Sequence, residues 1–204
     1  PRWQRRKEAR PQEIVAAALE LFVRQGFAAT RIEDVARAAG VRPGTVYVYF
    51  ASKEALLEAV VTDAVRPAIG FAERRVADHE GPSAELVRDL VLGWWREFGT
   101  TAYWGVNRLI VAEAAHFPRL AEFYVREVME RARALCRAVL ARGIARGEFR
   151  AVDVDRAVLV LLAPLIWAEI HAFSLQAHDP AFHDVPALLE THLDVFLHGL
   201  VATP

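Results

Sequence analysis

Two short amphipathic segments joined by a tight turn, within residues 30–50, constrain this chain more than any other part of its sequence. Thr30 suits the position that caps a helix, with Glu33 three residues later to reach back to that cap. Gly40 suits the left-handed residue that ends this helix, and Pro43 suits the first turn of a second helix. The apolar positions recur at helical spacing in both segments: Ile32, Val35, Ala36 and Ala39, then Val46 and Phe50.

This pair of segments has the features of a helix-turn-helix, whose second helix enters the major groove of DNA. Small residues at Ala36, Ala39 and Gly40 allow the two helices to approach each other closely. Arg42 stands at the start of the second helix, and its guanidinium offers paired donors that fit N7 and O6 of guanine. We therefore expect residues 30–50 to read DNA.

The run G-V-R-P-G-T-V-Y-V-Y-F-A-S-K-E-A-L, from Gly40 to Leu56, resembles the DNA-binding signature of the tetracycline-repressor (TetR) family. Arg42 departs from the pattern, since Ser is common at its position. A looser resemblance to C-terminal domains of the same family covers Arg108 to Tyr124. By matching position, the resemblance implies contacts with base edges from Arg42, Pro43, Gly44 and Thr45. It implies contacts with phosphates from Thr30, Tyr47, Tyr49 and Lys53.

A separate physical argument also places a phosphate near Lys53. Ser52 suits the N-cap of a fourth helix, so Lys53 lies in its first turn, where the helix dipole disfavours a cation. A phosphate bound at this helix N-terminus would relieve that conflict. A solvated lysine with no ligand is the alternative.

Positive charge in this chain is local. The 204 residues carry a formal net charge of −1, so DNA binding has to depend on the charge of particular segments. Residues 1–10 hold five basic side chains against one acidic side chain. We expect this basic arm either to follow DNA phosphates or the minor groove, or to remain a solvated tail.

Few residues suggest catalysis, metal binding or membrane insertion. The single Cys136 excludes an internal disulfide, and its apolar neighbours predict a small buried hydrophobe. Five of the seven histidines lie between His171 and His198 at no ligand spacing typical of metal sites. The longest uncharged apolar run has 12 residues, whereas a membrane span needs about 20. We expect no catalytic residues, no metal, no cofactor, no membrane partner and a cytoplasmic location.

Helix-breaking residues divide the whole chain into helical segments, and no alternating strand pattern occurs. We expect an all-α fold of about nine helices, the first of which starts at Pro11. A three-helix helix-turn-helix unit forms its N-terminal part, and a helical bundle forms its C-terminal part. The expected divisions are a DNA-binding domain (1–51, with the arm at 1–10), a connecting helix (52–80) and an effector-binding and dimerisation domain (81–204).

Aromatic residues are concentrated in the predicted C-terminal bundle. Core packing explains each of them taken singly, but together they exceed what a small bundle needs. We therefore expect an effector pocket from Trp94, Phe98, Trp104, Arg108, Trp167 and His171. Arg108 could bind a ligand carboxylate, or it could pair with Glu113 or with an acid of another helix.

Residues 157–168 are apolar on every face of a helix, and such a helix has to be buried on all sides. Its own chain can cover one side, so the other side needs a partner. We expect the helices near 157–176 and 186–201 to pair across a two-fold axis, and the family resemblance implies the same two helices. The expected interface residues are Leu161, Leu165, Leu193, Phe196 and Leu200.

The sequence thus predicts a ligand-responsive repressor that binds an inverted-repeat operator in double-stranded DNA as a homodimer. The resemblance implies that a small hydrophobic or aromatic effector shifts the fourth helix and so releases the DNA. Two alternatives stay open, namely a DNA-binding or partner-binding protein without an effector, and an enzyme built in a helical bundle. A fully packed C-terminal core would favour the first alternative.

Overall fold

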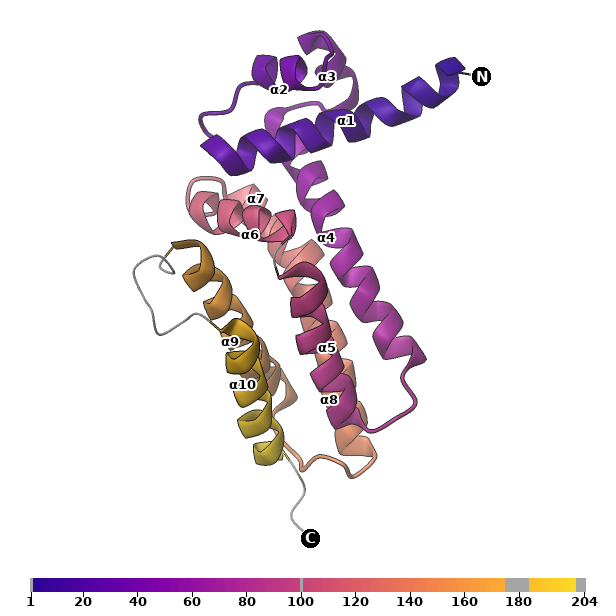
Figure 1. Ribbon diagram of the computed structural model, residues 1–204, viewed down its shortest axis with the longest axis vertical. Coiled ribbons are helices and arrows are strands. Elements are labelled where there is room, and N and C mark those ends of the chain that lie inside the picture. Colours follow the sequence, from indigo (N-terminus) through magenta and orange to yellow (C-terminus); the bar gives the residue numbers. More distant parts are fainter. Residues whose placement is uncertain (1, 100, 175–183, 201–204) are drawn as a thin grey trace. The chain divides into compact units, whose positions relative to one another are not determined.

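The computed structural model describes residues 2–99, 101–174 and 184–200 (Figure 1). Its helices are α1 (Arg2–Gln25), α2 (Ile32–Ala38), α3 (Pro43–Tyr49), α4 (Lys53–Asp78), α5 (Ser83–Phe98), α6 (Ala102–Glu113), α7 (Pro118–Tyr124), α8 (Glu130–Ala145), α9 (Val154–Ser174) and α10 (Val185–Leu200). A π-helical turn at Val125–Met129 joins α7 to α8 without a break. The described residues therefore form nine helical runs, which confirms the predicted all-α fold.

Two compact units divide the chain. The first unit combines Pro1–Arg66 with Gly105–Glu127, and the second combines Pro67–Trp104 with Val128–Pro204. Helix α4 continues through the boundary at Pro67, so it belongs to both units. This division differs from the continuous ranges expected from the sequence, because most of α6 and all of α7 pack with the N-terminal helices.

The first unit is built on α1, α2 and α3, which contact one another pairwise. Its core side chains include Ile14, Phe22, Val35, Val46 and Leu56, all of them fully buried. Gly26 and Gly40 follow α1 and α2 with φ of +86° and +64°, a region that side chains other than glycine rarely adopt. The predicted glycine turn at Gly40 is therefore confirmed, and Gly26 forms a second turn of the same kind.

Two helix starts differ from the prediction. Helix α1 begins at Arg2 and contains Pro11, so the backbone of residues 2–10 is helical. Helix α2 has Arg31 at its N-cap position, so the predicted Thr30 cap is wrong. The Thr30 hydroxyl is instead buried and donates to the carbonyl oxygen of Gly26 at 2.7 Å. Thr30 therefore stabilises the loop between α1 and α2 and does not cap α2.

The second unit contains a ring of four helices in which α5 contacts α8, α8 contacts α9, α9 contacts α10, and α10 contacts α5. Side chains of these helices, together with Phe149 between α8 and α9, form one apolar core: Leu86, Val87, Val91, Val139, Leu140, Phe149, Val158, Leu161, Leu165, Ala168, Val185, Leu189, Leu193, Leu197 and Leu200. Asp153 and Asp184 accept hydrogen bonds from the N–H groups of Arg156 and Ala187, which caps the starts of α9 and α10.

Membrane insertion has no support in the described helices, since none of them combines the length and the apolar composition that crossing a bilayer requires.

Candidate DNA interface

Helix α3 has one buried side and one exposed side. Val46 is fully buried, whereas Val48 is 78% exposed. Because successive residues of an α-helix are rotated by about 100°, Gly44 and Val48 both point nearly opposite to Val46. A Cβ atom added at Gly44 would meet no other atom within 4 Å. The outward face of α3 is therefore open to a partner along its whole length.

The residues predicted to read bases lie at the start of this exposed face. Arg42 occupies the N-cap position of α3, and its exposed side chain makes no capping hydrogen bond. Pro43 and Gly44 are also exposed, and Thr45 is half-buried. Tyr47 is 53% exposed. The structure thus exposes Arg42, Pro43 and Gly44 at the start of α3 and Tyr47 further along it, while the contacts of these residues with bases and phosphates stay predictions.

Lys53 and Thr30, both predicted to contact phosphates, are engaged within the protein. The Lys53 ammonium donates to the carbonyl oxygens of Phe27, Ala28 and Thr30 at 2.8, 3.3 and 3.0 Å. It also lies 4.4 Å from the centroid of the Phe27 ring, within cation–π range. Lys53 therefore fastens the α1–α2 loop to the start of α4. Ser52 caps α4 as predicted, since its Oγ accepts the N–H of Ala55 at 3.1 Å.

Val48 was not among the residues that the sequence singled out. Its signal was present, because a position two residues after a buried Val46 in a helix has to face outward. The family signature has no fixed residue type there, so the resemblance gave Val48 no role.

Four of the residues predicted to bind an effector form two pairs of neighbouring rings in the second unit, Trp94 with Phe98 on α5 and Trp167 with His171 on α9. Trp94 and Phe98 are half-buried neighbours on α5, with ring centroids 6.4 Å apart, and Phe98 meets Phe71 of α4 edge to face. On α9, His171 is fully buried, whereas Trp167 is 52% exposed and so points largely to solvent. The side chain of Trp104 lies outside the described residues.

Arg108 belongs to the first unit, whereas Trp94, Phe98, Trp167 and His171 belong to the second. Its exposed guanidinium donates to the carbonyl oxygen of Val23 in the last turn of α1, at 3.1 Å. None of the partners considered from the sequence is needed to explain this position, whether a ligand carboxylate, Glu113 or an acid of another helix. A basic side chain near a helix C-terminus also interacts favourably with the helix dipole.

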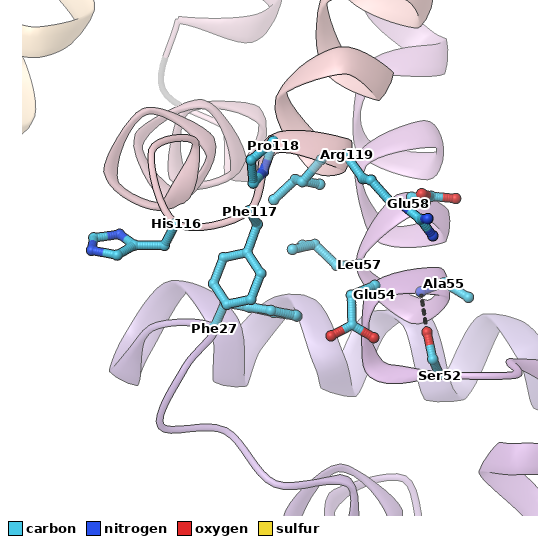
Figure 2. A pocket seen from close by; sticks show the side chains of 11 residues that line it. Phe27, Ser52, Glu54, Ala55, Leu57, Glu58, His116, Phe117, Pro118 and Arg119 are labelled. Carbon is cyan, nitrogen blue, oxygen red and sulfur yellow. Dashed lines mark hydrogen bonds between the residues drawn. The ribbon is translucent and has the colours of Figure 1, made fainter.

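A cavity of about 420 Å³ lies within the first unit, between the first turns of α4 and the segment that leads into α7 (Figure 2). Phe27, Leu57 and Phe117 supply apolar side chains, and Glu54 and Glu58 lie on α4. The pKa of Glu54 is lowered, mainly by a hydrogen bond from its own backbone N–H. The cavity has the size of a small-molecule site, but it includes none of the predicted effector residues.

Burial corrects the predicted interface residues. Four of them lie in the core of their own chain: Leu161, Leu165, Leu193 and Leu200. A side chain that its own chain already covers cannot face a partner. The exposed apolar residues of the same helices are different ones, namely Leu159, Val160, Ile166 and Trp167 on α9 and Val195 on α10. Phe196 is half-buried and packs against the core.

Cys136 packs against the core of the second unit, and burial raises the pKa of its thiol to about 11. The thiol is therefore protonated at neutral pH, as expected for a small packing residue. Within the described ranges, no three His, Cys, Asp or Glu side chains come close enough together to hold a metal ion. His178 and His183 lie outside these ranges.

Comparison with known families identifies both parts of the chain. Residues 14–60 match the model described as bacterial regulatory proteins of the tetR family. Residues 76–184 match the model of the tetracyclin repressor-like C-terminal domain. The first match contains the exposed helix α3, and the second covers more than half of the chain.

Individual relatives agree with these matches. The transcriptional repressor KstR2 of Rhodococcus jostii is 28% identical over 159 residues, which cover 74% of each chain. Among solved structures, FadR of Bacillus subtilis, in complex with stearoyl-CoA, has a TM-score of 0.78 and 21% identity and covers 92% of this chain and 98% of its own. SmeT, the repressor of a multidrug efflux pump of Stenotrophomonas maltophilia, has a TM-score of 0.74 and 21% identity. The match covers 94% of this chain and 90% of SmeT.

The two structural similarities establish the fold, and the family matches also establish the class of protein. This family is not one of enzymes, which removes the enzymatic alternative. With a helix-turn-helix whose second helix is exposed and a matching C-terminal bundle, the chain belongs to the TetR family of DNA-binding transcriptional regulators.

Proposed function

We propose that this protein is a repressor that binds an inverted-repeat operator as a homodimer and is released by a small hydrophobic or aromatic effector. It acts on DNA in the cytoplasm. The observation that carries the proposal is the exposed surface of α3, where Arg42 stands at the N-terminus, Tyr47 is 53% exposed and Gly44 faces away from the buried Val46. The Arg42 guanidinium and the Tyr47 hydroxyl can therefore donate hydrogen bonds to acceptors of the DNA.

Local chemistry supports DNA as the partner of α3. The whole chain is close to neutral, so attraction to phosphates depends on particular side chains. Arg42 supplies a two-donor fork for guanine, and the Tyr47 hydroxyl supplies a donor for a phosphate oxygen. Gly44 adds no side chain, so the helix backbone can approach the bases closely.

The outer side of α9 supports the homodimer. Leu159, Val160, Ile166 and Trp167 are each about half exposed, and helical spacing places them on one stripe opposite the core residues Leu161 and Leu165. A contiguous exposed apolar stripe of this kind is typical of an interaction surface. A two-fold axis at this stripe would set two α3 helices at a fixed spacing, as an inverted repeat requires.

Two observations support an apolar effector. Trp94 and Phe98 add a half-buried aromatic pair to the bundle of the second unit. FadR, which shares the fold, was solved with stearoyl-CoA, so long-chain acyl-CoA is the first compound to test. The effector can release DNA only if it binds the non-DNA-binding state more tightly than the other state.

Selection from a random DNA pool tests the DNA-binding part. We expect the full chain to enrich one inverted repeat whose half-sites lie about one helical turn apart, or a multiple of it, with two chains bound per site. Enrichment of an unrelated or non-repeated sequence would contradict the dimeric operator, and no enrichment would contradict specific DNA binding.

Release of the selected operator tests the effector part. Stearoyl-CoA or another apolar compound is expected to lower DNA affinity and raise the melting temperature of the free protein. Coenzyme A without an acyl chain is the matched control, because it keeps the charged part and lacks the apolar part. If no apolar compound of a broad library changes DNA affinity, the alternative of an effector-independent DNA-binding protein replaces this proposal.

A further inference from the structure

The outward face of α3 carries an apolar side chain that the DNA-reading residues do not explain. Val48 is 78% exposed, more than Tyr47 beside it or the exposed valines Val111 and Val195. Exposing an isopropyl group to this extent gains nothing for folding, because Val46 supplies the contact of α3 with the core. The position is therefore available for a partner.

We propose that Val48 selects thymine by contact with its C5-methyl group. This inference rests on the proposed binding of α3 in the major groove. Among the groups by which base pairs are recognised in that groove, the thymine methyl is the apolar one, and the others donate or accept hydrogen bonds. An exposed valine has no hydrogen bond to offer, so its favourable contact there is with that methyl.

The geometry of α3 makes room for this contact. Gly44 lies one turn before Val48 on the same face, and a side chain there would meet open space. Glycine at this position therefore lowers the surface next to Val48, so that the valine methyls are not held away from the base by a neighbour on the preceding turn. Gly44 and Val48 thus form a strip of the α3 surface on which Gly44 adds no side chain and Val48 adds an apolar one.

The distance from Arg42 sets where the thymine should lie. Val48 lies six positions after Arg42, which corresponds to about 9 Å along a helix. Bases on one strand are about 3.4 Å apart along the DNA axis. The thymine selected by Val48 is therefore expected within about three base pairs of the guanine selected by Arg42.

The test compares thymine with deoxyuridine, which lacks only the C5-methyl group. Each thymine of the selected operator is replaced in turn, symmetrically in both half-sites, and affinity is measured for the wild-type chain and for Val48→Ala. We expect one position at which uracil weakens wild-type binding about fourfold per half-site, the size of one buried methyl group. At that position uracil should have no further effect on Val48→Ala.

Three results are possible. Loss of the uracil effect in Val48→Ala supports the proposal. A specific operator with no uracil-sensitive thymine, or with an effect that persists in Val48→Ala, overturns the role of Val48 and leaves the regulator function intact. Failure to select any DNA sequence overturns both. Since Val48 is exposed, Val48→Ala should have the same melting temperature as the wild type. Tyr47→Phe serves as a control that leaves the uracil effect unchanged.

Discussion

At the scale of single residues, Glu148 is a capping group supplied from far along the chain. Its carboxylate accepts the backbone N–H of Ser83 at 2.6 Å, in the first turn of α5, and pairs with Arg146 at 2.9 Å. These contacts, with the Ser83 bond first, lower the pKa of Glu148. A negative charge at this end of α5 also suits the helix dipole.

Glu148→Gln is therefore expected to lower the melting temperature at pH 7. A folded-state pKa below the ordinary 4.5 gives stability that is present above that value and lost as the pH falls through the lowered pKa. The melting difference between wild type and variant should shrink below pH 4.5. Thermal melts between pH 7 and pH 3 measure it, and a difference that grows with acid would contradict the role of the charge.

Lys53 offers a second test at this scale. Lys53→Met keeps a long apolar side chain but leaves three loop carbonyl oxygens without their donor, so it should lower the free energy of unfolding by about 1–3 kcal/mol. Urea titration measures this loss. If stability is unchanged and the slope of log DNA affinity against log salt concentration falls by about one, Lys53 acts on phosphate alone.

At the scale of elements, the close contact of α8 with the residues that follow it depends on Gly143. A Cβ atom there would overlap the Phe149 ring, which is itself 4% exposed. Gly143→Ala should therefore destabilise the fold by about 1–3 kcal/mol, as overpacking does. Gly199→Ala is the matched control in α10, where the added atom meets open space and should be neutral or stabilising. Equal melting temperatures for both variants would refute this packing.

The sequence predicted where most helices lie along the chain, but it did not predict which helices pack together. Periodicity and breakers placed the start of α3 at Pro43, because such signals are local. They could not show that most of α6 joins the first unit, since this depends on contacts such as Arg108 with Val23, 85 residues away. The apolar run 157–168 predicted a second buried side, but only the structure shows that Leu161 faces the core and Val160 faces outward.

The sequence also predicted part of the candidate DNA interface. The family signature identified α3 as the reading helix, and the exposed Arg42 and Tyr47 agree with it. It could not show that the Lys53 ammonium is held by loop carbonyls or that Thr30 is buried, because both depend on how the α1–α2 loop folds back. Nor could aromatic content alone show that Trp167 points outward.

At the scale of the whole molecule, the outer stripe of α9 is the expected dimer contact. Val160→Glu should dissociate the dimer with little change in the fold of the chain, because Val160 is 56% exposed. Sedimentation at micromolar concentration measures this. Val111→Glu, at a valine of α6 that is 65% exposed, is the control and should leave the dimer intact. Leu161→Glu is unsuitable, since a charge at a core position should unfold the chain.

A Val160→Glu chain that remains dimeric would place the interface elsewhere. A wild-type monomer that still binds an inverted repeat would contradict the dimer itself.

The central claim is that the outward face of α3 reads DNA sequence, and the ratio of operator affinity to scrambled-DNA affinity tests it most directly. Fluorescence anisotropy at one fixed salt concentration gives this ratio for the wild type, for Arg42→Ala and for Arg24→Ala, which removes a positive charge from the exposed surface of α1. Arg42→Ala should weaken operator binding by about 1–3 kcal/mol and lower the ratio, whereas Arg24→Ala should keep it. An unchanged ratio in Arg42→Ala would contradict the account.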